Sequence, residues 1–240
     1  MPRVHPRRVV AGMATIANRS HLLLKVIASI APQVDELVVY ANDWGPTDGI
    51  PAGALPKNVR LIVDRPLGDL GDNGKLYGLE MLRARGDDLS DVLYVCCDDD
   101  IVYPPDFVAR VMPAARTEIW GVHGIRIIEP IATYYRSRRT YNYVTELPRM
   151  LRVSALGTGA VAFWAEAVGI RLEHAPVPNM LDVWMAIYAK AHGIVMRAVP
   201  RAAGWLEILP APHTIYDRAR HDDWLQTLLV KGASPWPQKM

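Results

Sequence analysis

Residues 91–105, DVLYVCCDDDIVYPP, constrain the fold more than any other part of the chain. The apolar run 92–97 is rich in β-branched residues and cysteine, which predicts a strand buried on both faces of a parallel sheet. Three carboxylates follow it, Asp98, Asp99 and Asp100. Because side chains alternate along a strand, we expect Asp98 and Asp100 on one face and Asp99 on the other.

Carboxylates at the carboxyl end of a buried strand are well placed to bind a ligand. Ligands of open α/β sheets bind at the carboxyl ends of the strands, and hard divalent cations prefer carboxylate oxygens. Residues 98–100 therefore predict a metal site that holds a polyanionic ligand. The structural alternative is an acidic turn that solvates the end of the strand.

Length and charge leave the class of partner open. A chain of 240 residues can bury a substantial core as one large domain or two small ones. There are 27 Lys and Arg against 25 Asp and Glu, for a formal net charge of +2, so overall charge does not call for nucleic acid. The two cysteines, Cys96 and Cys97, are adjacent on the predicted strand and poorly placed for a mutual disulfide. We expect buried thiols in a reducing compartment.

The first apolar run resembles a short signal peptide, because Arg3, Arg7 and Arg8 precede residues 9–17. Gly12 and Thr15 interrupt the run, and a helical pattern follows it directly, so we interpret it as the first core strand. No other run approaches the roughly 18 apolar residues of a membrane span. A cytoplasmic location is expected.

Strands and helices alternate in the first half of the chain. Strands are predicted at 8–13, 37–41, 59–63 and 92–97, separated by helices at 20–30 and 75–84 and followed by a short helix at 106–112. This order predicts an α/β fold with a parallel, doubly wound sheet. Ser20 is the expected cap of the first helix.

The second half has a different rhythm. Its predicted strands are 119–128, 152–156, 160–164 and 195–199, with a further candidate at 205–209, and its predicted helices are 182–191 and 223–230. The segment 133–149 is aromatic and basic without a clean period, and the tail 233–240 is expected to be loose.

A polar loop at 68–75, GDLGDNGK, could expose backbone N–H groups beside a lysine, which suits phosphate. It is not a P-loop, because Leu76 follows Gly74 and Lys75. Alone this is a weak signal, and a plain flexible turn is the commoner explanation of such a loop. The same alternatives apply to Gly157, Thr158 and Gly159, which allow either close substrate approach or a simple tight turn.

Three further features have both a functional and a structural interpretation. Asp182 is either a general base or a helix N-cap. His213 is either a metal ligand or a solvated loop histidine. The Tyr/Arg segment 134–143 suits an anionic or sugar acceptor, membrane head groups or a surface flap.

Several motifs together resemble bacterial glycosyltransferases of the GT-A fold, in particular small GT2-like enzymes of capsule or cell-surface polysaccharide synthesis. The motifs are MATIANR (13–19), PQVD (32–35), GDNGK (71–75), DDDIVYPP (98–105), VHG (122–124), GTG (157–159) and MLDVW (180–184). The resemblance runs over about residues 9–229. It implies a single GT-A domain over 1–240, with an open, mostly parallel sheet covered by helices on both faces. Residues 9–112 would be the nucleotide-binding half and 113–230 the acceptor-side half.

The resemblance also assigns roles. Asp98 and Asp100 match a DxD motif, with Asp100 as ligand of Mn²⁺ or Mg²⁺, Asp98 as ligand of the metal or the ribose, and Asp99 facing the donor sugar. Asp182 matches the base of an inverting enzyme, and His213 a late histidine that completes the metal shell. The remaining matches are nucleotide-sugar-binding residues: Thr15, Arg19, Asp72, Lys75, Gly157, Thr158 and Gly159.

The implied activity is metal-dependent transfer of a sugar from a nucleotide-sugar, commonly a UDP-sugar, to a saccharide, a lipid-linked saccharide or another hydroxyl acceptor. Neither a nucleic-acid partner nor a transmembrane segment is expected, and the location is cytoplasmic or peripheral to the inner membrane face. The QxxRW motif of processive membrane synthases is absent, which favours a single-addition enzyme.

Two rival classes remain. A metal-dependent nucleotidyltransferase also combines an open sheet with phosphate-binding loops, but residues 14–19 lack the glycine-rich loop usual in such enzymes. A non-catalytic carbohydrate-binding module with the same fold is the other. Nucleic-acid binding is a weaker fourth reading, because the whole chain is almost neutral.

Overall fold

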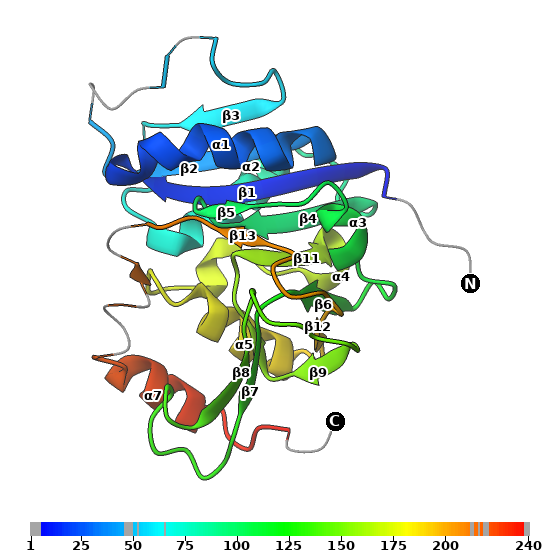
Figure 1. Cartoon of the computed structure of the whole chain (residues 1–240), viewed down its shortest axis with the longest axis vertical. Helices are drawn as coiled ribbons and strands as arrows, with labels where there is room; N and C mark the ends of the chain where they lie inside the picture. Colours follow the sequence, from blue (N-terminus) through cyan, green and yellow to red (C-terminus); the bar gives the residue numbers. More distant parts are fainter. Residues whose placement is uncertain are drawn as a thin grey trace.

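The structure is a computed structural model that describes residues 6–45, 50–51, 53–64, 66–211, 214–215, 217 and 221–237. Within these residues the main sheet has eight strands in the order β3-β2-β1-β4-β11-β6-β12-β9 (Figure 1). Their bounds are β1 Arg8–Ile16, β2 Glu36–Asn42, β3 Val59–Ile62, β4 Val92–Cys97, β6 Glu118–Gly121, β9 Leu151–Val153, β11 Ala160–Trp164 and β12 Val195–Ala198. The predicted α/β class is therefore confirmed.

The sheet is mixed rather than wholly parallel. Strands β3, β2, β1 and β4 pair in parallel, as do β6 and β12, whereas β11 is antiparallel to both of its neighbours and β9 is antiparallel to β12. The four parallel strands all end at the same edge. β11 begins there, since Ala160 pairs with Cys97 at the end of β4.

Two smaller sheets flank the main one. Strands β10 (Ala155–Leu156), β7 (Gly124–Ile127) and β8 (Arg138–Tyr141) form an antiparallel sheet, and β5 (Ile101–Val102) pairs with β13 (Glu207–Ile208). The helices are α1 Ser20–Ile30, α2 Tyr77–Ala84, α3 Phe107–Val111, α4 Ala165–Val168, α5 Leu181–Ala191 and α7 Trp224–Gly232. Short 3-10 helices span Ala17–Arg19 (η1), Ala31–Gln33 (η2), Gly71–Leu76 (η3) and Leu172–His174 (η4).

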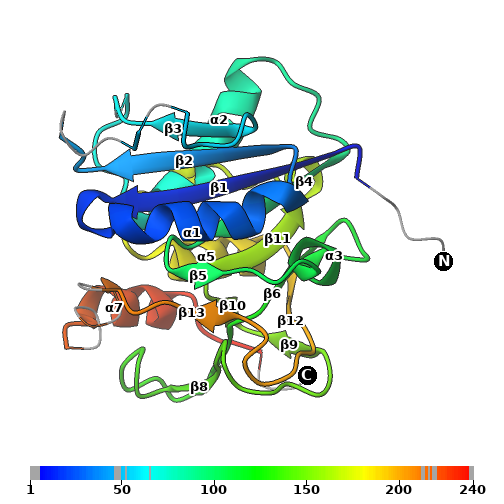
Figure 2. The same ribbon diagram turned by 45° about the horizontal axis from the view of Figure 1, so that its top comes forward.

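Helices cover both faces of the sheet because alternate side chains of its central strands enter two separate cores. From β4, Tyr94 and Cys96 enter the core shared with α2 and α5, whereas Val95 and Cys97 enter the core shared with α1 and α3. Figures 1 and 2 show the central strands between α1 and α2. Both cysteines are free and buried, as predicted. Each fully buried aliphatic side chain stabilises such a core by roughly 1.5–3 kcal/mol.

Several predicted elements need correction. The segment 119–128 is not one strand: it divides between β6 and β7, which lie in different sheets. The chain changes sheets between Gly121 and Gly124, where a Cβ would lie 2.6 Å from Val161 and 2.9 Å from Ala198 respectively. Likewise 152–156 divides between β9 and β10 around Ser154.

Local predictions at the helix ends also need correction. Ser20 does not cap α1: it is the first helical residue, and Arg19 is the N-cap without a side-chain bond. The tail is not loose over 233–237, because Trp236 is buried and its indole N–H donates to the carbonyl of Val230 at 2.7 Å. Residues 238–240 lie outside the described part of the chain.

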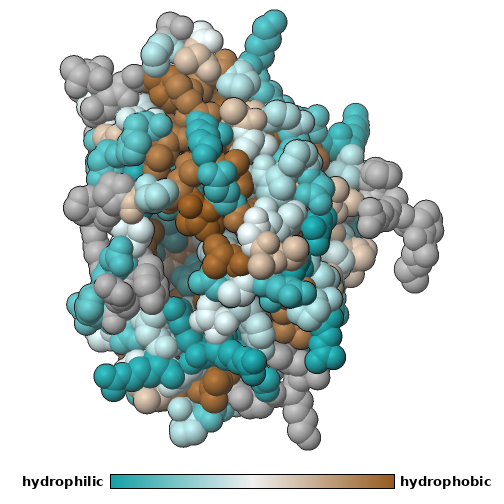
Figure 3. All heavy atoms as spheres, in the orientation of Figure 1, coloured by the Kyte–Doolittle hydropathy of each residue, from teal (hydrophilic) through white to brown (hydrophobic). Residues whose placement is uncertain are grey.

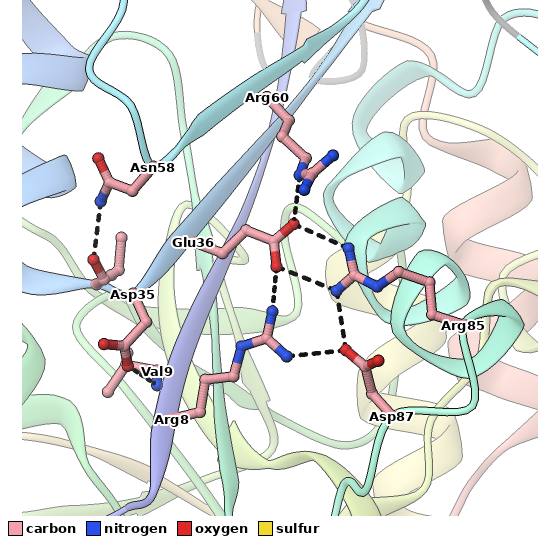
Figure 4. Close-up of polar contacts among 9 residues, drawn as sticks. Arg8, Val9, Asp35, Glu36, Asn58, Arg60, Arg85 and Asp87 are labelled. Atoms are coloured by element: carbon pink, nitrogen blue, oxygen red, sulfur yellow. Dashed lines mark hydrogen bonds and ion pairs between the residues drawn. The ribbon is translucent and has the colours of Figure 1, made fainter.

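Five charged residues meet at the amino ends of the parallel strands, and we call them the amino-end cluster: Arg8, Glu36, Arg60, Arg85 and Asp87 (Figure 4). Glu36 pairs with all three arginines, including Arg60 at 2.9 Å and Arg85 at 3.1 Å. Asp87 pairs with Arg8 at 2.8 Å and Arg85 at 2.9 Å. Although burial raises the pKa of Glu36, its hydrogen bond with Arg85 and the other arginines lower the pKa below its usual value. Every charge of this cluster thus has a partner of opposite sign.

None of the described helices is both long and apolar enough to cross a membrane. On the face seen in Figure 3, hydrophobic surface gathers in the upper part, over α1. Leu24 of α1 is 40% exposed.

Candidate functional site

The candidate site lies at the carboxyl ends of β1, β2 and β4. Registers of the parallel strands place Ile16 opposite Asn42 and Met13 opposite Cys97, so the loops that follow these strands lie side by side. They border a cavity of about 500 Å³. Sequence-predicted residues in its lining are Thr15, Arg19, Asp72, Lys75, Asp98 and Asp99.

The three consecutive carboxylates do not alternate as predicted, because β4 ends at Cys97 and the chain turns. Arg19 contacts both Asp99, at 2.7 Å, and Asp100, at 3.4 Å. Asp98 instead pairs with Lys75 at 2.5 Å. The carboxylates are therefore divided between two cations, with Asp99 and Asp100 sharing one of them.

Asp99 is the most deeply buried of the three, at 3% exposure. Burial raises its pKa, while the charge of Arg19 and the hydrogen bond from Arg19 oppose the rise. Arg19 belongs to η1, directly after β1, so this contact fixes the β1 loop to the β4 loop. Asp99 has a clear structural role whatever ligand the site binds.

Asp100 is held in a less favourable electrostatic environment. Burial, together with the like charges of Asp98 and Asp99, raises its pKa to about 7, against the opposing effect of Arg19. A third carboxyl group in this position is easier to keep ionised when more positive charge is near.

Lys75 belongs to η3, and its side chain reaches Asp98 at the end of β4. The backbone around Lys75 is tightly packed. Its carbonyl accepts a hydrogen bond from the Tyr94 hydroxyl at 2.6 Å. A Cβ on Gly12 would lie 1.9 Å from the same carbonyl, so only glycine lets β1 pass η3 at this point. The Lys75 ammonium also contacts the Thr158 hydroxyl at 3.3 Å. Burial lowers the pKa of Lys75, but Asp98 and Asp72 together raise it by more, so the side chain stays a cation.

The predicted Gly157–Gly159 loop joins the site at Asp98. The Asp98 backbone N–H donates to the carbonyl of Gly159 at 3.2 Å, and the Tyr103 hydroxyl donates to that carbonyl at 2.6 Å. A Cβ on Gly159 would lie 1.9 Å from the Asp98 carboxylate. Any side chain at position 159 would therefore collide with the Asp98 carboxylate. Gly157 lies against Tyr143 and His123.

Asp72 contacts the helix that carries the predicted base. Its Oδ2 accepts from the backbone N–H of Leu181 at 3.2 Å, at the first residue of α5. Its Oδ1 is buried without a hydrogen bond among the described residues. Burial raises the pKa of Asp72 to about 6, although Lys75 lowers it.

Asp182 is not the N-cap of α5, because Met180 occupies that position. Asp182 lies in the first turn, and its Oδ2 accepts a hydrogen bond from the Tyr134 hydroxyl at 2.9 Å. No hydrogen bond to Oδ1 is found in the part of the chain that the structure describes. The structural alternative to a base is thus a carboxylate held by Tyr134.

Tyr134 itself is firmly placed and 2% exposed. Its backbone N–H donates to the Thr227 hydroxyl at 2.8 Å, and the Arg138 guanidinium lies 4.7 Å from its ring centre. The contact to Asp182 gives part of the Tyr/Arg segment 134–143 a defined position over the site. A second residue of that segment, Tyr143, has its ring 4.6 Å from that of His123.

Fit to a metal rests on two of the three predicted ligands. No group of three Asp, Glu, His or Cys side chains converges strongly enough to hold a metal ion alone, within the described ranges. His213, the third predicted ligand, lies outside those ranges. The charges of Asp98 and Asp100 nevertheless suit a divalent cation. Its positive charge would offset the neighbouring negative charges that raise the pKa of Asp100.

Sequence reasoning missed several residues that line the cavity. Asn42 bonds the carbonyl of Gly71 at 2.9 Å and the N–H of Leu70 at 2.9 Å, fixing η3 to the end of β2. Asn42 followed a predicted strand, so its position was a usable signal. Gln226 gave no such signal, because it occupies an ordinary position in α7.

Comparison with known proteins adds no assignment. No protein-family model matches the chain, and no curated protein matches it.

Proposed function

We propose that the chain is a metal-dependent glycosyltransferase of the GT-A type that transfers a sugar from a nucleotide-sugar to a hydroxyl acceptor with inversion. One observation carries this proposal. Lys75, Arg19 and three carboxylates, those of Asp72, Asp98 and Asp99, line one cavity at the carboxyl ends of parallel strands. Asp100 pairs with the same arginine, and Asp182, held by Tyr134, lies on α5, whose first residue bonds Asp72. The resemblance of the sequence motifs to GT-A enzymes supports the same reading.

The first part of the task is to bind a diphosphate. Lys75 is a permanent buried cation and is available to a phosphate oxygen beside Asp98. Asp98 and Asp100 would hold Mn²⁺ or Mg²⁺, whose shell substrate phosphates commonly complete. When bound, such a cation offsets the negative charge that grows on the leaving nucleoside diphosphate.

The second part is to activate the acceptor. Tyr134 donates to Oδ2 of Asp182 and so fixes the rotation of the carboxylate. Oδ1 is then the oxygen that takes the proton of the incoming hydroxyl as that hydroxyl attacks the anomeric carbon. Attack from the face opposite the leaving diphosphate inverts the configuration. The base at Asp182 and the diphosphate site at Lys75 and Asp98 thus have separate tasks.

Product analysis tests this proposal. The protein is incubated with UDP-, GDP- and dTDP-sugars in Mn²⁺, with and without simple saccharide acceptors, and the products are followed by NMR. We expect one nucleotide-sugar to release its nucleoside diphosphate and to give a glycoside of inverted configuration. Retention would refute Asp182 as the base, and release of pyrophosphate from a nucleoside triphosphate would replace the proposal with a nucleotidyltransferase.

A further inference from the structure

A buried glutamine in the wall of the cavity has no role in the mechanism described above. Gln226 lies in the first turn of α7, is 7% exposed and lines the cavity together with Lys75 and Asp98. No hydrogen bond to its carboxamide is found among the residues described by the structure. The carboxamide atoms nevertheless keep some exposure, and the residue lines the cavity, so a ligand there can reach them. A ligand with hydroxyl or amide groups could supply the hydrogen bonds that the protein does not.

The surroundings of Gln226 indicate what kind of group it faces. Its neighbour Leu225 packs against the apolar cluster that contains Met180, and both of these residues line the cavity. Val177 and Pro178 also line it. Asn179 and Asp222 add polar groups to these apolar residues, and such a mixed wall suits a ligand with an apolar face and a few polar substituents. A pyranose ring has this character, with C–H groups on its faces and hydroxyl or acetamido groups at its rim.

Helix α7 is linked to the proposed base through Tyr134. Thr227, the residue after Gln226, accepts a hydrogen bond from the backbone N–H of Tyr134, and the Tyr134 hydroxyl donates to Asp182 of α5. Gln226 therefore lies on the helix that positions Tyr134. The nucleotide side of the cavity, by contrast, is built from the ends of β1 and β2.

From these observations we infer that Gln226 is a specificity-determining residue that binds a hydroxyl or acetamido group of the donor sugar. The inference rests on the proposed function and deepens it, because it identifies the recognition of the sugar apart from the nucleotide. The carboxamide offers both a donor and an acceptor, so it can pair with a hydroxyl or with an amide. Gln226 does not take part in the chemical step.

The test compares Gln226→Met with a matched control, Lys231→Met. Both replace a polar side chain of α7 by methionine, but Lys231 is exposed in the last turn and does not line the cavity. Methionine keeps the length and helix propensity of glutamine. Calorimetric titration in Mn²⁺ would measure the affinity of each variant for UDP, UDP-glucose and UDP-N-acetylglucosamine, with the GDP and GDP-mannose pair in parallel.

We expect Gln226→Met to bind the nucleoside diphosphate as the wild type does and the nucleotide-sugar about three- to tenfold more weakly, the value of one neutral hydrogen bond. Lys231→Met should bind both normally. A loss confined to UDP-N-acetylglucosamine would identify the acetamido group as the contact, and a loss shared with UDP-glucose a hydroxyl. Equal binding of the nucleotide-sugar by both variants, or an equal loss for the nucleoside diphosphate, would overturn the inference while leaving the proposed function intact. Failure of the wild type to bind any of these nucleotides would refute both.

Discussion

The two ends of the parallel strands carry charged clusters of opposite design. At the amino ends, Glu36 and Asp87 are shared among three arginines, and every charge has a partner (Figure 4). At the carboxyl ends, four carboxyl groups face two cations in the carboxyl-end cluster, which consists of Arg19, Asp72, Lys75, Asp98, Asp99 and Asp100. The first cluster is complete by itself and stabilises the fold. The second has an excess of buried negative charge, which is what a site for a cation and its phosphate ligand requires.

Their pKa shifts show the same difference. The arginines lower the pKa of Glu36, whereas burial raises the pKa of Asp72 to about 6 and, with neighbouring charge, that of Asp100 to about 7. Perturbed groups in a cavity mark candidate functional sites more often than exposed ion pairs do. The following experiments separate a cluster built for stability from one built for binding.

The largest effect is expected at the proposed base, Asp182. Asp182→Asn keeps the size of the side chain and can still accept the Tyr134 hydroxyl, but it cannot take a proton. We expect turnover to fall by about two to four decades, with nucleotide affinity nearly unchanged. Steady-state kinetics and calorimetric titration would measure both. Activity within tenfold of the wild type would show that Asp182 has only a structural role.

A matched pair of variants, one in each cluster, compares binding with stability. Asp98→Asn should weaken the binding of UDP in Mn²⁺ by about two decades, because it removes a charge from the proposed phosphate and metal site. Glu36→Gln should leave this affinity unchanged and lower the free energy of unfolding by about 2 kcal/mol, because three arginines lose their common partner.

Calorimetric titration and chemical denaturation would give the two quantities for each variant. The comparison fails if Glu36→Gln weakens UDP binding as much as Asp98→Asn does, or if Asp98→Asn lowers the free energy of unfolding more than Glu36→Gln.

A smaller effect is expected where the site meets the Tyr/Arg segment. Tyr134→Phe removes the hydroxyl that donates to Asp182 but keeps the ring beneath Arg138. Without that hydroxyl the Asp182 carboxylate is free to rotate, so Oδ1 is held less well toward the acceptor hydroxyl. We expect kcat to fall about tenfold with the donor KM unchanged. A lower free energy of unfolding with kcat unchanged would mean that Tyr134 is only a packing residue.

The smallest effect concerns stability against pH, where the two ends should respond with opposite sign. Glu36 has a lowered pKa in the fold, so its contribution to stability is complete above its unfolded value of about 4.5 and is lost as the pH falls through the folded pKa. Asp72 has a raised pKa, so it costs stability above about pH 6, and the cost disappears as the pH falls from about 6 to 3.8.

Asp72→Asn should therefore raise the free energy of unfolding by about 1–2 kcal/mol at pH 7.5 and by much less at pH 4.5. Urea denaturation at the two pH values checks this, with Glu36→Gln as the opposite case. An Asp72→Asn effect that is independent of pH would contradict the raised pKa.

Much of the sheet was predictable because its central strands are buried on both faces. Continuous apolar runs at 37–41 and 92–97 correspond closely to β2 and β4. Prediction failed where tertiary contacts divide an apolar segment into two strands. Residues 119–128 alternate well enough for one strand, but the close neighbours of Gly121 and Gly124 come from other strands and leave no mark in the local sequence. The same is true of Trp236, which is buried only because Val230 and its neighbours lie beside it.

The candidate site followed the same rule. Asp98 and Lys75 were predictable because they follow a strand or begin a helix, and parallel strands bring such residues together. Arg19 was expected only from the resemblance of residues 13–19. The partition of the carboxylates between Arg19 and Lys75 was not predictable, because alternation stops where β4 ends. Nor was the contact of Tyr134 with Asp182, which joins segments 48 residues apart.

The most direct test of the account is a thermal-shift measurement with UDP, GDP, CMP and dTDP, each with and without Mn²⁺, on the wild type, Asp98→Asn and Glu36→Gln. The account predicts that one nucleoside diphosphate raises the melting temperature of the wild type and of Glu36→Gln only when Mn²⁺ is present, and that Asp98→Asn shows no such rise. Equal melting temperatures with and without every nucleotide and metal pair, in all three proteins, would contradict the claim that the carboxyl ends of the strands form a nucleotide site.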